Sequence, residues 1–288
     1  MPKRFRDLIL GALCVLLSLP APVLACTVFA ATDGSVTLAG NNEDWFDGDT
    51  YIWFLPGDGH AYGRAFYGFE NAHPQGGMNE KGLFFDWFAF GGELSPPLEG
   101  QAIYEGDLSD LLLETCATVE EALALFSQYH EPSFGYASIL LADSTGDMAT
   151  VTWDWDAGSP LIQRGQPSLA IGVGRDRVEP LLAEPGAVTE DAFTRMLFQA
   201  HNHNTLYSTL CDLNARRITL YSRGDFSQEV VFDLDMELSR GIHMYYIPSL
   251  FPDTPGEPPD TFTPFNLRSA AANILLILFG AGFLLILV

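Results

Sequence analysis

The sequence predicts an α+β domain in which antiparallel sheets carry helices on their outer faces. Three observations predict this class: short β-branched and aromatic segments joined by tight turns come first, amphipathic helical segments lie in the middle, and three more strand-like segments follow. The stretch between the two chain ends is long enough to bury a substantial core. We therefore expect one large domain rather than several small ones.

Tight turns identify the first strands. Asp33-Gly34 lies between CTVFAAT and SVTLAG, and an Asp-Gly pair supplies the positive φ that a hairpin needs. A polar turn from Asn79 to Gly82 has the same role between a glycine-rich segment and the apolar LFFDWFAF. The other predicted strands are 51–56, 63–69, 137–143, 148–153, 205–213, 216–222 and 228–234.

Two helices are predicted between these groups of strands. Thr118 followed by Glu121 is a capping box, so a helix should begin near Val119. The segment TEDAFTRMLFQA, residues 189–200, has apolar residues at helical spacing. Sheets that are built from the flanking strands would bury the apolar faces of both helices.

The amino-terminal segment 1–25 has the pattern of a secretory signal peptide. It begins with the basic MPKRFRD and continues with an apolar stretch that ends in small residues. Val23 and Ala25 occupy the two small-residue positions that a signal peptidase reads. Cleavage after Ala25 would make Cys26 the first residue of the mature protein.

The carboxyl-terminal segment predicts a membrane anchor. Residues 270–288 are apolar almost throughout and long enough to cross about 30 Å of hydrocarbon. Residues 251–269, rich in Pro, Asp and Thr, are typical of an extended stalk. The alternative is a buried helix at the end of the domain. We therefore expect an exported domain, 26–250, on the extracytoplasmic face of a membrane, and the sequence leaves its oligomeric state open.

The net charge, the histidines and the cysteines indicate which partners, metals and disulfides to expect. A formal net charge of -23 argues against nucleic acid, which requires a cationic surface. We expect no cofactor and no metal, because His201 and His203 have no acidic or Cys cluster beside them. Cys116 and Cys211 remain beside Cys26 after cleavage, a count that fits one disulfide and one free thiol.

An amino-terminal cysteine suits nucleophilic catalysis. A thiol needs a base to become a thiolate, and the α-amino group of the same residue, with a reference pKa of about 8, can act as that base. A Cys-His pair with His60 or His73 is the alternative, although no local motif supports it. Cys26 is therefore the predicted nucleophile.

Several motifs together resemble the choloylglycine hydrolase and penicillin V acylase family of N-terminal-nucleophile hydrolases. They are Cys26-Thr27, then GNNEDW at 40–45, GMNEKGL at 77–83, ADSTGDMATV at 142–151 and TLYSTLCDLNARRITLY at 205–221. The resemblance implies a four-layer αββα sandwich with antiparallel sheets. It also implies cleavage of a linear, non-peptide C–N amide bond in a small N-acyl substrate, through an acyl-enzyme.

The resemblance also implies roles for individual residues. Asp44 corresponds to the aspartate that holds the α-amino group near the Cys26 thiol. Asn41 stands where the bile salt and penicillin enzymes carry Arg, so thiolate stabilisation here must rely on neutral donors. Arg175 resembles a later active-site arginine, with Arg177 as the alternative. Trp45, Asp86 and Trp87 are the predicted substrate-binding residues.

Three alternatives to an amidohydrolase stay open. Residues 23–26 approximate a lipobox, in which Cys26 would be lipidated, although Leu24 is unusual there and a carboxyl-terminal anchor would make the lipid redundant. A membrane-tethered acyl-binding protein could keep the fold without activity. An acyltransferase would share the acyl-enzyme and differ only in the acceptor.

Overall fold

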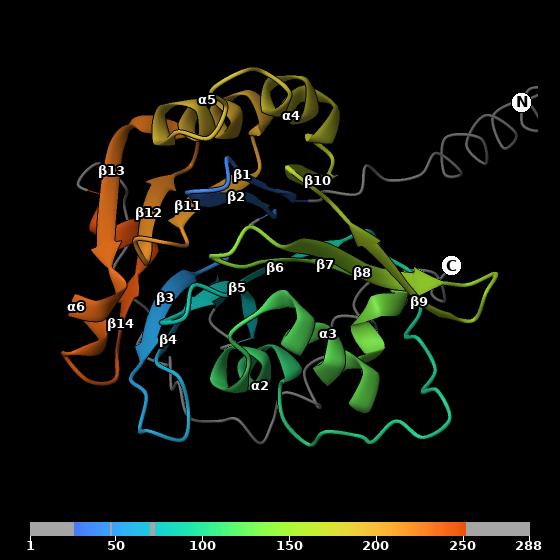
Figure 1. Cartoon of the computed structure of the whole chain (residues 1–288). Coiled ribbons are helices and arrows are strands. Elements are labelled where there is room, and N and C mark those ends of the chain that lie inside the picture. Colours follow the sequence, from blue (N-terminus) through green and yellow to red (C-terminus); the bar gives the residue numbers. More distant parts are fainter. Residues whose placement is uncertain (1–25, 47, 70–72, 252–288) are drawn as a thin grey trace, which may run out of the picture.

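The computed structural model describes residues 26–46, 48–69 and 73–251, which form four layers. Two antiparallel sheets lie face to face, α4 and α5 cover the outer face of one, and α2 and α3 cover the outer face of the other (Figure 1). The predicted α+β class and the αββα sandwich are confirmed. The central strands of each sheet are buried on both faces because a helical layer lies on one side and the other sheet on the opposite side.

The first sheet has six strands in the order β10-β1-β2-β11-β12-β13. The predicted hairpin forms its centre, and Gly34 in the turn has a φ of 88°. The bounds of the strands are β1 Thr27–Thr32, β2 Thr37–Asp44, β10 Ser168–Gly172, β11 Thr205–Asp212, β12 Arg217–Ser222 and β13 Asp225–Asp233.

The second sheet has eight strands in the order β14-β3-β4-β5-β6-β7-β8-β9. The predicted turn between β5 and β6 closes at Gly82, which has a φ of 78°. The bounds are β3 Thr50–Leu55, β4 Arg64–Phe69, β5 Pro74–Asn79, β6 Phe84–Ala89, β7 Ala137–Ala142, β8 Met148–Asp154, β9 Ser159–Arg164 and β14 His243–Tyr246.

The helices begin at side-chain caps in most cases. The capping box of Thr118 and Glu121 is formed at the start of α3, as predicted. Thr189 caps α5 through a hydrogen bond from the amide of Ala192. The bounds are α2 Leu108–Thr115, α3 Val119–Gln128, α4 Arg175–Leu182, α5 Glu190–Ala200 and α6 Leu234–Leu238, with 3-10 turns η1 Pro132–Gly135 and η2 Ile247–Leu250.

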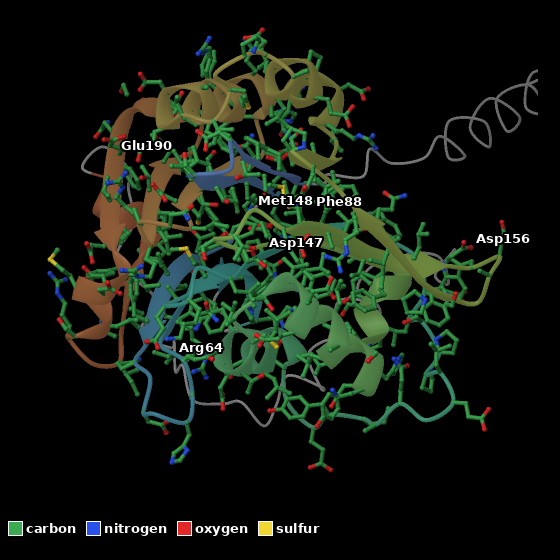
Figure 2. The ribbon with its side chains drawn as sticks, in the orientation of Figure 1. Arg64, Phe88, Asp147, Met148, Asp156 and Glu190 are labelled. Carbon is green, nitrogen blue, oxygen red and sulfur yellow. The ribbon has the colours of Figure 1, made fainter. Side chains whose placement is uncertain are left out.

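The main core lies between the two sheets. Alternate residues of β1, β2, β11 and β12 meet alternate residues of β3 to β8 there, including Val28, Tyr67, Met78 and Phe84. Met148 belongs to this core, and Phe88 packs against its edge (Figure 2). Two further clusters lie outside the sheets, one under α2 and α3 and the other under α4 and α5. The side chains between the sheets are therefore isolated from water.

Several features differ from the expectations or lie outside them. Elements α2, α4, α6, β9, β10 and β14 were not predicted. Cys116 and Cys211 are free and lie in separate clusters on opposite faces of the eight-stranded sheet, so the disulfide that the cysteine count allowed is not formed.

The predicted segments at the two chain ends lie outside the described residues. These are the signal peptide 1–25, the stalk 251–269 apart from Phe251, and the anchor 270–288. In the part of the chain that the structure describes, none of the helices combines the length and the apolar character needed to span a membrane. Signal peptide, stalk and anchor remain predictions.

Candidate active site

Cys26 lies directly before β1, and its side chain faces the space between the sheets. Val28 and Ala30, which follow it at the period of a strand, belong to the core between the sheets. Cys26 is 7% exposed, and its carbonyl accepts a hydrogen bond from the amide of Val173. The predicted nucleophile is thus held at the end of a central strand.

Two glycines, one at the end of β10 and one just after it, allow the chain to approach Cys26 closely. Gly172 has a φ of 103°, and a Cβ atom there would lie 2.1 Å from the carbonyl oxygen of Cys26. At Gly174 a Cβ atom would lie 2.6 Å from Oγ1 of Thr27, which accepts a hydrogen bond from the Gly174 amide. The segment 172–174 can therefore carry no side chain at either glycine without moving the start of β1.

Glu43, a residue that the sequence analysis did not select, contacts the thiol. The Cys26 Sγ donates a hydrogen bond to Glu43 Oε1 at 3.3 Å. Glu43 is 2% exposed, and burial raises its pKa to about 7, against hydrogen bonds from Cys26 and Asn41 that lower it. Burial, followed by the charge of Glu43, raises the pKa of the Cys26 thiol well above its usual range. The thiol is therefore protonated at rest.

Among the described residues, Asn41 hydrogen bonds to Glu43 and not to the Cys26 thiol. Its Nδ2 donates to Glu43 Oε2 at 3.4 Å, and the Tyr207 hydroxyl donates to the same oxygen at 3.4 Å. In the described part of the chain, Oδ1 of Asn41 has no hydrogen-bond partner. Asn41 was expected to stand beside the thiol. In the structure it acts on the Glu43 carboxyl group instead, which its hydrogen bond orients.

Asp44 points to the opposite face of β2 from Glu43. Its carboxylate accepts hydrogen bonds from Thr205 Oγ1 and from Asn202 Nδ2, the latter at 2.6 Å. Burial raises the pKa of Asp44 to about 6, while these hydrogen bonds and the charge of Arg177 lower it. The backbone amide of Asp44 approaches the Cys26 thiol and lowers its pKa. The part of Asp44 that approaches the Cys26 thiol is therefore its backbone amide.

Of the two predicted arginines, Arg177 is nearer to this site. Arg175 lies on the outer surface at the start of α4, where its side chain is 55% exposed and pairs with Glu179. Arg177 donates to the carbonyl of Gln199, near the end of α5, and its charge acts on Asp44. The structure therefore does not bring Arg175 to Cys26, because the first turn of α4 directs its side chain toward solvent.

Asp86 enters the space between the sheets from the opposite sheet. It is fully buried, and burial, followed by the charge of Glu43, raises its pKa well above the usual range. Tyr67 on β4 lies beside it, and Gly76 on β5 lies between the two strands. Only a glycine fits at this position, because a Cβ atom there would lie 2.2 Å from Asp86 Oδ2. Asp86 is thus a buried carboxyl group, across from Glu43, whose environment disfavours the charged form.

The two predicted tryptophans lie in different places. Trp87 follows Asp86 on β6 and faces α2, where its Nε1 donates to Ser109 Oγ at 3.0 Å. The alternation of a strand therefore separates Trp87 from Cys26. Trp45, one residue beyond β2, is 40% exposed and contacts Phe46 and Phe69. It offers an apolar surface beside the end of the strand that carries Glu43.

Histidines do not complete the site. His73 pairs with Asp107 at the start of α2, and His60 lies in the exposed turn between β3 and β4, so neither supports a Cys-His pair with Cys26. Across residues 26–46, 48–69 and 73–251, no three His, Cys, Asp or Glu side chains form a group that could hold a metal ion.

Comparison with known proteins gives a likeness in structure alone. No family model and no curated protein matches the sequence. Penicillin V acylase from Agrobacterium tumefaciens superimposes with a TM-score of 0.54 at 16% identity, covering 77% of this chain and 92% of that chain. A variant and a mutant of conjugated bile acid hydrolase from Clostridium perfringens each superimpose with a TM-score of 0.61, at 15% and 14% identity, covering 82% of this chain and 100% of theirs.

This chain has the fold of penicillin V acylase and conjugated bile acid hydrolase. Within that fold, its polar side chains between the sheets are neutral or acidic: Cys26, Asn41, Glu43, Tyr67, Asp86, Tyr207 and Thr209, which we call the intersheet cluster. In the described residues, no ion pair includes Glu43 or Asp86. The thiol thus has a carboxyl partner in place of a cation.

Proposed function

We propose that this protein is an N-terminal cysteine amidohydrolase that cleaves a linear, non-peptide C–N amide bond of an N-acyl substrate. The observation that carries the proposal is the position of Cys26, whose thiol lies between the sheets of the sandwich in hydrogen-bond contact with a carboxyl group. The fold supports it, because the similar structures include penicillin V acylase and conjugated bile acid hydrolase.

The chemistry proceeds through a thioester. A base takes the thiol proton, Sγ attacks the amide carbonyl, and the C–N bond breaks as the amine leaves with a proton. Water then hydrolyses the thioester and releases the acid. The α-amino group that cleavage after Ala25 would free is the base expected from the sequence. The backbone amide of Asp44, which approaches Sγ, is placed to donate to the oxyanion.

The substrate carries an apolar acyl group and no anionic group near the scissile bond. Trp45, Phe46 and Phe69 form an aromatic surface beside the end of β2, on which an acyl chain can pack. The carboxylate form of Glu43, whose pKa is about 7, would repel an anion that entered the intersheet cluster. Uncharged or cationic amides therefore suit the site better than acidic ones.

The lipoprotein alternative conflicts with the burial of Cys26. A lipidated cysteine must hold its sulfur at the surface, whereas this thiol is in a residue that is 7% exposed and hydrogen bonds inside the sandwich. We further propose that the domain is exported and tethered to a membrane by 270–288. The intact mass of the mature chain tests whether Cys26 is lipidated and whether segment 1–25 has been removed. A lipid adduct on Cys26 would contradict the unmodified thiol, and a retained segment 1–25 would contradict export.

Cys26→Ala and Cys26→Ser test the proposed function. Hydrolysis of long-chain acyl amides, acyl-homoserine lactones and phenoxyacetyl amides should fall by about a thousandfold or more in both variants. Cys116→Ala, which removes another buried thiol, should retain the activity. A covalent acyl adduct should appear on Cys26 in intact-mass spectra of the wild type.

Three outcomes would separate the alternatives. Hydrolysis that survives Cys26→Ala would contradict the nucleophile. A protein that binds acyl amides without turning any of them over would favour the acyl-binding alternative. Transfer of the acyl group to an added amine, in preference to water, would favour the acyltransferase.

A further inference from the structure

The Glu43 carboxyl group is held so that one oxygen faces the thiol. Asn41 Nδ2 and the Tyr207 hydroxyl both donate to Oε2, each at 3.4 Å, and the Cys26 thiol donates to Oε1 at 3.3 Å. All three donors are uncharged, and all three residues are buried. The two donors on Oε2 fix the orientation of the carboxyl plane and leave Oε1 for the proton of Cys26.

The strand register makes this contact a property of the fold. Thr27 pairs with Asn42 across β1 and β2, so Cys26 stands opposite Glu43 one residue further along the antiparallel ladder. Glu43 also pairs with Tyr207 across β2 and β11. Side chains opposite each other in a ladder lie on the same face, so Cys26, Glu43 and Tyr207 all enter the space between the sheets.

A structural role does not account for Glu43. A buried carboxylate is costly unless a cation or several strong donors compensate it. Glu43 has three weak contacts, and no Lys or Arg of the described residues forms an ion pair with it. The groups that face it from the neighbouring strands are Cys26, Asn41, Tyr67, Asp86 and Tyr207, with the Asp44 carboxylate adding repulsion along β2.

We propose that Glu43 is the catalytic residue that takes the proton of the Cys26 thiol and later delivers it to the leaving amine. The proposal rests on the proposed function and replaces the α-amino group as the proton acceptor. It needs no movement of the chain, because the thiol already donates to the accepting oxygen.

The steps balance without a further reactant. The S–H bond breaks toward Glu43 Oε1 as the S–C bond forms, which leaves Glu43 as a carboxylic acid and the substrate as a tetrahedral oxyanion. The acid gives its proton to the nitrogen as the C–N bond breaks. In the second half, Glu43 takes a proton from the attacking water and returns it to Sγ as the thioester breaks. A carboxyl group with a pKa of about 7 is suited to both directions near neutral pH.

Glu43→Gln separates proton transfer from thiolate formation. Hydrolysis should fall by about a hundredfold or more, because the amide side chain cannot accept a proton. The rise of wild-type kcat/KM with pH through about 7, where Glu43 ionises, should disappear. Alkylation of Cys26 by iodoacetamide, followed by peptide mass spectrometry, should shift to lower pH, because the carboxylate raises the pKa of the thiol.

A matched control and a second variant keep the test decisive. Glu237→Gln changes another buried glutamate, one that pairs with Arg240 and His243, and should alter neither the alkylation profile nor hydrolysis. Glu43→Asp keeps the carboxyl group but moves it away from the Cys26 thiol, because the side chain is one methylene shorter. This variant should hydrolyse the substrate more slowly, with the pH dependence of kcat/KM retained. It also supplies a readout if Glu43→Gln does not fold.

Failure of this proposal is distinguishable from failure of the proposed function. If Glu43→Gln hydrolyses at the wild-type rate with the wild-type pH dependence while Cys26→Ala is inactive, Glu43 is not the proton acceptor and the amidohydrolase stands. If Cys26→Ala remains active, the proposed function falls. A Cys26 alkylation profile that is unchanged by Glu43→Gln would overturn the coupling of the two groups whatever the hydrolysis result.

Discussion

Cys26 and Glu43 face each other across β1 and β2, with Sγ donating to Oε1 at 3.3 Å. A single hairpin, closed by a turn at Asp33-Gly34, therefore carries both the nucleophile and its carboxyl partner. Because the hairpin is local in sequence, the geometry of this pair depends on one strand register. The rest of the sandwich buries the pair, with Cys26 7% and Glu43 2% exposed.

We expect Glu43→Gln to stabilise the protein at alkaline pH. Burial raises the pKa of Glu43 from 4.5 to about 7, so the folded state binds a proton between these values that the unfolded state has lost. Stability from this group is thus full below pH 4.5 and falls as the pH rises to about 7. A shift of this size corresponds to a penalty on the order of 3 kcal/mol above pH 7.

Chemical denaturation at pH 5 and pH 8.5 measures this effect. The gain in the free energy of unfolding of Glu43→Gln over wild type should be large at the higher pH and small at the lower one. Glu237→Gln should have the opposite sign near neutral pH, because it loses ion pairs with Arg240 and His243. A Glu43→Gln protein that is less stable than wild type at pH 8.5 would show that the carboxylate contributes to folding.

Local sequence patterns predict part of the fold and part of the candidate site. The hairpin, the helix at Val119 and the position of Cys26 followed from local turn and cap chemistry, which depends on neighbouring residues. Glu43 was missed because the family resemblance drew attention to Asp44. Counting residues of β2 from Asn41 at a period of two would have selected Glu43 as the carboxyl on the same face.

Other features depend on contacts between distant segments and could not be predicted in this way. The electrostatic interaction between Asp86 and Glu43 requires the stacking of two sheets, and only the packed structure shows it. The edge strand β9 is mostly exposed and lacks a clear apolar alternation, so its sequence carries little strand signal. Helix α4 contains Pro180 and has no side-chain cap, which removes the usual signals of a helix.

We expect Gly172→Ala to destabilise the protein and to reduce hydrolysis. The residue has a φ of 103°, and its new Cβ would lie 2.1 Å from the Cys26 carbonyl oxygen. The backbone strain alone costs about 1 kcal/mol, and the clash must add to it by moving the start of β1. Thermal unfolding should therefore show a loss of about 3 kcal/mol or more, together with a lower rate of hydrolysis.

Gly59→Ala is the matched control for Gly172→Ala. Gly59 has a similar φ of 90°, but a Cβ there meets no atom within 4 Å. Its loss of stability should be limited to about 1 kcal/mol, with hydrolysis unchanged. If the two variants lost equal stability, the close approach of Gly172 to Cys26 would have no energetic consequence, and only the φ of the two positions would matter.

We expect Trp45→Ala to weaken binding of long acyl chains without slowing the chemical step. Trp45 is 40% exposed and packs with Phe46 and Phe69 beside the end of β2, away from the thiol contact of Glu43. Loss of an aromatic contact worth about 1.4 kcal/mol raises KM about tenfold for a long acyl amide. The acetyl analogue, too short to reach the aromatic surface, should show almost no change.

Steady-state kinetics with acyl amides of increasing chain length measure this effect, with Trp155→Ala as the control. Trp155 is 53% exposed and lies in the turn between β8 and β9 beside Trp153, so its removal should leave KM and kcat unchanged at every chain length. A rise in KM alone indicates binding that is shared by ground state and transition state. A fall in kcat that is equal for long and short substrates would instead mean that Trp45 positions Asp44 and the end of β2, and the acyl surface would have to lie elsewhere.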